Sequence, residues 1–253
     1  GGSDSAAGTN WANAFRTVTK ALTRAREGTR IYVATGLYST AAGEVFPLTA
    51  AYLPGLQILG TNAAGTVLDA GAGSARVLSL TGVGGDAQVI GVTLTRGRGA
   101  NGGALYVAVG ALELRDCVMS ASRAYTGGNA YGGGVYGADA FIWMSNCLLV
   151  ANWTEGGGAN ALYGGGVYAG GRGSLRIQDS VIISNYLSNG VKYGAGVYVA
   201  MSSEPNLLRN VLIATNTGVT QGGGILMAGG SLGLDQVTVV DNPVEGIRLS
   251  AGS

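Results

Sequence analysis

The chain contains 253 residues, of which 47% are hydrophobic and 11% are charged, and its formal net charge is +1. This balance gives no general attraction to nucleic acid or to an acidic membrane surface, and a charged fraction far below about 25% argues against an ordinary soluble helical domain. The absence of histidine excludes a histidine-based catalytic triad and histidine-ligated zinc.

The first predicted element is an amphipathic helix over residues 10–27. Apolar residues recur at helical spacing through this stretch, and Gly28 follows it, where a left-handed residue often ends a helix. Short apolar runs bounded by glycine come next, beginning at residues 30–33, and they predict strands. We therefore expect a capping helix followed by a first group of β coils over residues 30–101.

A repeat dominates the rest of the chain. The sequence Tyr-Gly-[Gly/Ala]-Gly-Val-Tyr occurs at residues 131–136, 163–168 and 193–198, and coils cut at equivalent glycines are 30, 32, 30, 28 and 24 residues apart. Such a period indicates one supersecondary unit stacked on copies of itself. Aligning the coils gives two wholly apolar columns: Leu105, Val135, Val167, Val197 and Ile225, and then Leu114, Met144, Ile177, Leu208 and Leu234.

These columns predict a parallel β-helix, an all-β solenoid in which equivalent side chains stack about 4.8 Å apart along the axis. Glycine makes up 47 residues without a Gly-X-Y period, which suits sharp turns between short strands. We expect regular repeats of about 24–32 residues over residues 102–250. The whole of residues 1–253 then forms a single domain.

Two polar columns run at fixed phase beside the apolar ones. Their residue types tolerate left-handed backbone and bond to nearby main chain, which predicts turn ladders rather than a reactive site. Asp116 and Asp179 are separated by Asn146, so they lie about 10 Å apart, too far to share one ion. No metal site is expected. The columns are Asp116, Asn146, Asp179, Asn210 and Gln236, and Ser122, Asn152, Asn185, Asn216 and Asn242.

Aromatic residues supply the candidate ligand site. The coils differ mainly in the segments that precede each glycine triplet, and insertions of this kind collect on one face of a solenoid, which is often its binding face. A further row of tyrosines follows the first apolar column and points outward, where it either binds a sugar chain or covers the sheet. The candidate residues are Tyr125, Trp153 and Tyr186 on the insertions, and Tyr136, Tyr168 and Tyr198 in the row.

The two cysteines, Cys117 and Cys147, occupy equivalent positions one coil apart. Their Cα atoms are expected about 4.8 Å from each other, a separation that a disulfide tolerates. In-register stacking directs both Cβ atoms the same way, however, which favours a pair of buried free thiols over a bridge.

The opening residues 8–15, 21–25 and 28–38 resemble the N-terminal cap of secreted right-handed parallel β-helix proteins. The later repeats are similar to the Gly-Gly-[Ala/Ile] and Phe-x-x-Asn pairs of polymorphic outer-membrane adhesins, with Ile or Val in place of Phe at 182–185 and 239–242. The resemblance implies a right-handed β-helix of the pectate-lyase-like superfamily, export, and a cell-surface or adhesive role. It implies no particular reaction, because this superfamily mixes enzymes and non-enzymes.

We therefore expect a non-catalytic structural or adhesive protein, secreted or on the cell surface after removal of a signal peptide. No catalytic residue, cofactor, nucleic-acid partner or transmembrane helix is expected. After Gly246 no amphipathic segment covers the last coil, which predicts head-to-tail self-association. The alternative is a carbohydrate-active protein, either a polysaccharide lyase-like enzyme or a glycan-binding module, that uses the aromatic edge and contacts polysaccharide or surface glycan.

Overall fold

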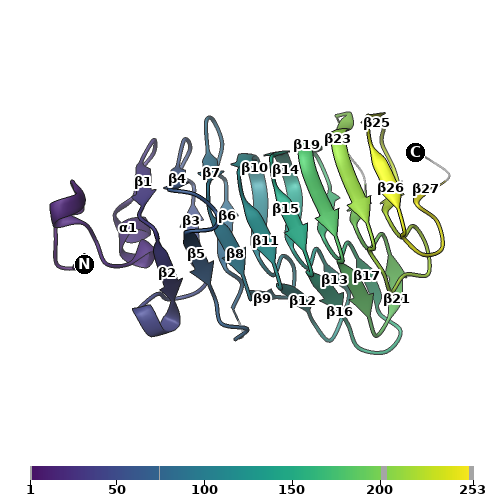
Figure 1. Ribbon diagram of the computed structural model, residues 1–253, viewed down its shortest axis with the longest axis horizontal. Coiled ribbons are helices and arrows are strands. Elements are labelled where there is room, and N and C mark those ends of the chain that lie inside the picture. Colours follow the sequence, from purple (N-terminus) through teal and green to yellow (C-terminus); the bar gives the residue numbers. More distant parts are fainter. Residues whose placement is uncertain (1, 74, 201–203, 251–253) are drawn as a thin grey trace.

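The computed structural model describes residues 2–73, 75–200 and 204–250. The chain winds into one elongated column of β coils, with its N-terminal segment at one end and the last coil at the other (Figure 1). All the pairings between consecutive coils are parallel and in register, which confirms the predicted parallel β-helix.

Among the described residues, twenty strands form one continuous sheet that bends around the column. The four long strands β10, β14, β19 and β23 each pass through a bend at a residue with positive φ, and each therefore belongs to two faces of the column. The strands are β1 (Arg30–Val33), β2 (Gly36–Ser39), β3 (Leu48–Ala51), β4 (Gln57–Gly60), β5 (Thr66–Asp69), β6 (Leu78–Thr81), β7 (Gln88–Ile90), β8 (Thr93–Thr95), β10 (Leu105–Arg115), β11 (Val118–Ser120), β14 (Val135–Ser145), β15 (Leu148–Val150), β18 (Val167–Gly170), β19 (Ser174–Ile183), β22 (Val197–Val199), β23 (Asn206–Ala214), β24 (Ile225–Met227), β25 (Leu232–Asp235), β26 (Thr238–Val240) and β27 (Ile247–Leu249).

Both predicted apolar columns are confirmed. Val135 pairs with Leu105 on one side and with Val167 on the other, and Val167 pairs in turn with Val197. Met144 lies between Leu114 and Ile177 in the same way. The side chains in both columns point inward and are buried through most of the column, so stacking of like residues builds one continuous core.

The glycines of the repeat are required by the bend that precedes each inward column. Gly132 has φ +61°, a conformation that strains any L side chain. At Gly133, a Cβ atom would lie 2.3 Å from the carbonyl oxygen of Trp153. The repeat therefore keeps glycine where the backbone of one segment passes directly over another.

The segments predicted as insertions are not irregular loops. They form a lobe along one side of the column, in its C-terminal half (Figure 1). The lobe has a small core of its own, built from Ala124, Ala130, Leu162, Leu187 and Ala195. Its four-stranded sheet contains β9 (Arg98–Gly99), β12 (Arg123–Tyr125), β16 (Trp153–Glu155) and β20 (Tyr186–Ser188), and its three-stranded sheet contains β13 (Ala130–Tyr131), β17 (Ala161–Tyr163) and β21 (Val191–Tyr193).

The N-terminal helix is shorter than predicted. In place of one helix over residues 10–27 there are a 3-10 turn, η1 (Trp11–Asn13), and a helix, α1 (Val18–Arg24), and a second 3-10 turn, η2 (Thr40–Ala42), follows β2. The carboxylate of Asp4 accepts hydrogen bonds from the backbone N–H groups of Arg16 and Thr17 at 2.9 and 3.0 Å, and Thr17 caps α1 through its side chain. These bonds hold the chain extended just before Val18. The helix ends at Arg24 because Ala25 is extended.

The predicted turn ladder is confirmed at the corner that follows the second apolar column. Its members have φ between +49° and +55°. The side-chain amide of Asn146 donates to Asp116 at 2.6 Å, and that of Asn210 donates to Asp179 at 2.8 Å. The carboxylates of this column are therefore engaged in structural hydrogen bonds.

The two ends of the column differ. At the N-terminal end, α1 packs against β1 and β3. At the other end the last described coil exposes Ile247 and Leu249, at 40% and 63%, which are the side chains that a further coil would cover, whether the same polypeptide or another copy supplied it. Head-to-tail association remains a prediction. Among the helices of the described residues, none has the length and apolarity needed to span a bilayer.

Candidate functional site

The predicted aromatic residues of the lobe lie on the outer face of its four-stranded sheet. Trp153 and Tyr186 are in register on β16 and β20, and their rings are stacked with centroids 5.7 Å apart and planes 2° from parallel. Burial and the nearby Glu155 carboxylate raise the pKa of Tyr186. One face of each ring is thus covered by the other ring. The remaining face of Tyr186 looks toward the next coil, where Thr217 is its in-register neighbour.

Tyr125 lies on the same outer face, one coil nearer the N-terminus. The guanidinium carbons of Arg98 and Arg123 lie 4.5 and 4.3 Å from the centre of its ring. Arg123 also pairs with Glu155, with Nη2 and Oε2 2.7 Å apart. Cation and ring attract each other in this geometry. The structure therefore brings Tyr125, Trp153 and Tyr186 together, but their rings and the neighbouring charges contact one another.

The predicted tyrosine row belongs to a double file. Tyr136, Tyr168 and Tyr198 stack in register at 5.2 and 5.6 Å between ring centroids, with Tyr106 below Tyr136 at 5.2 Å. A second file from the lobe, Tyr131, Tyr163 and Tyr193, stacks beside it, and Tyr163 meets Tyr198 edge-on at 4.8 Å.

This arrangement places both tyrosine files in the angle between the lobe and the column. Burial raises the pKa of Tyr168, and it raises that of Tyr198 to about 12. The rings are packed against rings, so the files join the lobe to the column by aromatic stacking. They leave little ring surface for a ligand.

The two cysteines are free and buried, as the sequence favoured. They lie next to each other in consecutive coils, just before the paired strands β11 and β15. The neighbouring Cys117 thiol and burial both raise the pKa of the Cys147 thiol, whose Sγ lies within hydrogen-bond distance of the carbonyl oxygens of Leu114 and Ser145. A protonated thiol in the core is a poor nucleophile and a poor metal ligand.

An open groove lies on another face of the column, across the second halves of β10 and β14 and the first halves of β19 and β23. Its volume is about 390 Å³. Trp143 forms its most exposed aromatic surface, with 42% of the residue accessible. It is lined by Glu113, Trp143, Met144, Ser145, Arg176, Ile177, Gln178, Leu207 and Arg209. We call this the Trp143 groove.

Trp143 differs from Trp153 in its neighbours. In the stacked strands it lies between Glu113 and Arg176, and no ring of the described residues stacks on it. Glu113 is held by the side-chain amide of Gln88 at 2.6 Å. The Arg176 guanidinium has no hydrogen-bond or ion-pair partner among the described residues. The groove thus offers an indole that is not covered by another ring, with polar side chains on both sides.

Sequence reasoning missed this site, although a signal was present. In β14 the residues Phe141 and Trp143 alternate with the buried Ile142 and Met144. Alternation places both aromatic side chains outside. Neither residue belongs to the tyrosine repeat or to the insertions, where the sequence predicted the ligand site.

Acidic side chains are the usual ligands of calcium and magnesium ions. Within residues 2–73, 75–200 and 204–250, no group of three or more His, Cys, Asp or Glu side chains is arranged to hold a metal ion. Asp69 binds Arg96, and Asp116 and Asp179 belong to the turn ladder.

The parallel coils, inward columns and turn ladders define a β-solenoid. Residues 77–253 match the family described as "Right handed beta helix region", which is more than half of the chain, so the chain belongs to the right-handed β-helix family. Residues 1–112 match "Protein of unknown function (DUF1565)". No curated protein sequence matches the chain.

One solved structure, described as "Crystal structure of Agl-KA catalytic domain", is similar at 10% identity with a TM-score of 0.22. The aligned region covers 92% of this chain and 64% of that one, so the chain spans less than two thirds of its length. A similarity at that TM-score carries no argument about function.

Proposed function

We propose that this chain is a non-catalytic β-helix that binds a polysaccharide in the Trp143 groove and acts as a secreted or cell-surface structural or adhesive protein. The observation that carries the proposal is the exposed Trp143 indole in an open groove of about 390 Å³. The adhesive setting is part of the same proposal and follows the expectation drawn from the sequence of the repeats.

The lining of the groove suits a saccharide. A sugar ring has an apolar face of C–H groups and a rim of hydroxyls, so it needs a flat apolar surface with hydrogen-bonding groups around it. Trp143 supplies the surface, and Ser145, Gln178 and Glu113 supply acceptors, with a donor from the Gln178 amide. Because the groove crosses successive coils, a chain of sugars would run along the solenoid axis.

Binding fits the groove better than cleavage does. Most glycosidases use two carboxyl groups that flank the bond to be broken. Glu113 provides the carboxylate among the lining residues, and Gln88 already donates to it. The groove therefore resembles a recognition surface more than a hydrolytic site.

A glycan array followed by affinity electrophoresis in the retained polysaccharides tests the proposal. We expect Trp143→Ala to weaken binding by about tenfold or more, as removal of a central aromatic anchor does at other binding sites. Trp153→Ala is the matched control, because it removes an indole that is stacked on Tyr186. Unchanged retention of Trp143→Ala would refute the Trp143 groove as the binding site.

The lobe face is a second candidate, favoured by the uncovered side of the Tyr186 ring over Thr217. If Tyr186→Ala and Trp153→Ala abolish retention while Trp143→Ala does not, the ligand binds at the lobe. Unsaturated products released from any retained polysaccharide, with or without calcium, would instead show a lyase and overturn the non-catalytic assignment.

A further inference from the structure

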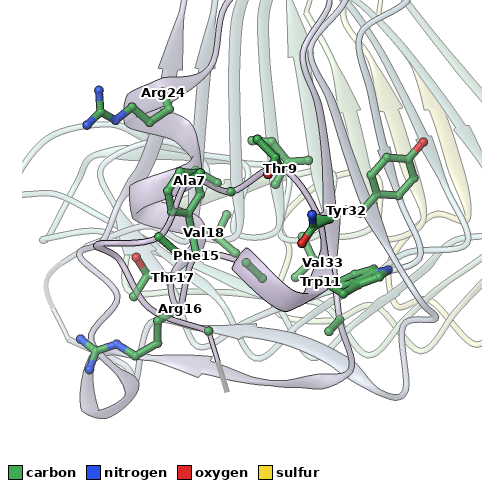
Figure 2. A pocket seen from close by; sticks show the side chains of 18 of the residues that line it. Ala7, Thr9, Trp11, Phe15, Arg16, Thr17, Val18, Arg24, Tyr32 and Val33 are labelled. Atoms are coloured by element: carbon green, nitrogen blue, oxygen red, sulfur yellow. The ribbon is translucent and has the colours of Figure 1, made fainter.

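A large groove lies at the N-terminal end of the column. It has a volume of about 1330 Å³ and lies between the N-terminal segment and the first coil. Figure 2 shows Trp11 and Phe15, which come from the N-terminal segment, and Tyr32 and Val33, which come from β1. Val18 and Ala21 of α1 also line it. Trp11 and Tyr32 are 66% and 61% exposed.

One wall of this groove is the free edge of a β-strand. β1 pairs with β4 on one side, and no other strand of the described residues pairs with its second edge. The backbone N–H of Gln57 donates to the carbonyl oxygen of Thr29. In a parallel ladder with this register, the N–H and C=O groups of Ile31 and Val33 also point toward β4. The N–H and C=O groups of Arg30 and Tyr32 therefore point into the groove, where an added strand could pair with them.

Charge is separated along the molecule. Residues 1–38 carry five basic side chains against two acidic ones, a net charge of +3. Because the whole chain has a net charge of +1, the remainder carries −2. The charged residues that line the groove are Arg16, Arg24 and Arg30, with no acidic residue among the lining. A partner for this end should be acidic.

We infer that the groove accepts an extended acidic peptide segment of another protein, which adds to β1 as a further strand. Its backbone pairs with the free N–H and C=O groups of Arg30 and Tyr32, as in other cases of strand addition. Alternate side chains of the segment continue the two files of β1. One file lies beside the buried Ile31 and Val33 and takes apolar residues, and the other lies beside Arg30 and Tyr32 and takes acidic ones.

This pattern defines the probe. A fluorescein-labelled octapeptide of alternating Glu and Val is titrated with the protein, and binding is followed by fluorescence anisotropy. We expect saturable binding that weakens as salt is raised. A peptide with Lys in place of Glu is expected to bind at least about tenfold more weakly, because its charges face arginines. Methylation of alternate backbone nitrogens, which removes donors from one edge of the peptide, is expected to cost a similar factor.

Two variants place the binding at β1. Tyr32→Pro removes the N–H that points into the groove while leaving the ladder with β4 intact, and Arg30→Gln removes one lining charge. Each should weaken binding several-fold, and amide hydrogen exchange at Arg30 and Tyr32 should slow when the Glu peptide is present. Arg172→Gln, exposed and far along the chain, is the matched charge control. If Tyr32→Pro fails to fold, Arg30→Gln and the methylated peptide still decide.

Several results would overturn the inference. Equal binding of the Lys and Glu peptides would show that the arginines do not select the peptide. Full binding of peptides methylated on either set of alternate backbone nitrogens would show that the peptide backbone does not pair with β1. Concentration-dependent sedimentation of the protein alone that the Glu peptide does not reverse would show that a second copy fills the groove. Tighter binding of dextran sulfate than of the peptide, with the same loss in Arg30→Gln, would make the site an anionic polysaccharide site.

Discussion

The side-chain amide of Asn185 donates to Oδ1 of Asn216 at 2.9 Å inside the solenoid, where both residues are fully buried. The same Oδ1 accepts from the backbone N–H of Asn185 at 3.0 Å, and the Asn185 amide also donates to the carbonyl oxygen of Leu149. Asn152 is bonded to Asn185 in the same way. Each asparagine therefore joins three coils, and the file satisfies the buried backbone groups at a bend.

We expect Asn185→Ala to lower the free energy of unfolding by about 3 kcal/mol or more. It removes the buried hydrogen bonds from the Asn185 amide to Leu149 and Asn216, and it leaves the buried backbone N–H of Asn152 without its acceptor, at about 1–3 kcal/mol for each buried group. Oδ1 of Asn216 keeps its bond from the backbone N–H of residue 185. Urea denaturation followed by circular dichroism measures the change. Asn146→Gly is the control: it breaks the exposed bond to Asp116 but keeps φ at +50° accessible, so it should cost less than about 1 kcal/mol. Equal losses would contradict the structural role of burial.

The tyrosine double file predicts a graded response at Tyr163. This ring contacts four others: Tyr131, Tyr168, Tyr193 and Tyr198. At about 0.5–1.5 kcal/mol for each of the four aromatic pairs, Tyr163→Ala should destabilise the protein by about 2–6 kcal/mol, whereas Tyr163→Phe keeps the stacking and should cost less than about 1 kcal/mol. Thermal unfolding of the two variants checks this. Similar losses in both would assign the stability to the hydroxyl instead.

The same file makes the fold sensitive to alkali. Burial raises the pKa of Tyr136 and Tyr168, and that of Tyr198 to about 12, from about 10 in an unfolded chain. The folded state holds these phenol protons more tightly, so their contribution to stability is complete below pH 10 and is lost as the pH rises through 12. Urea midpoints should fall steeply over that interval. Tyr198→Phe should show a smaller fall, and an identical pH profile would disprove the assignment to this file.

The periodic parts of the fold could be predicted because each coil repeats the same pattern of inward apolar residues and turn residues. Val135, Val167 and Val197 are all inward and in register, and the turn ladder follows from residue types that accept positive φ. The start of α1 could not be read from helical spacing. It depends on carboxylates at Asp4 and Glu44, outside the helix and brought to it only by folding.

The candidate site was partly predictable. Sequence placed Trp153 and Tyr186 on one face, which is correct, but it could not show that their rings would cover each other. The lobe core, which includes Leu162 and Leu187, could not be predicted because these segments vary in length from coil to coil. Trp143 could have been found from strand alternation alone.

Glu44 predicts how the N-terminal cap is held. Its buried carboxylate accepts from the backbone N–H groups of Val18 and Thr19 at 2.6 and 2.8 Å, at the start of α1. Hydrogen bonds to a charged group contribute about 1.5–3 kcal/mol each. Glu44→Ala should therefore increase hydrogen exchange throughout residues 17–24 before the coils open. Glu27→Ala, an exposed position near the same end, is the control, and equal exchange in the two variants would show that α1 is held by packing instead.

The buried thiols predict a reactivity test that also reports the packing of the coils. Cys117 and Cys147 are 1% and 3% exposed, so a maleimide should label neither in the native protein and both in urea without reductant. Native labelling should be slower by roughly 100-fold or more, since it requires opening of a core region that costs at least a few kcal/mol. Ala64→Cys, at an exposed turn, should react at once and serves as the positive control. If unfolded protein takes up label only after reduction, the two cysteines are bridged; if native protein labels as fast as Ala64→Cys, the two coils do not pack as closely as the in-register pairing of β11 with β15 requires.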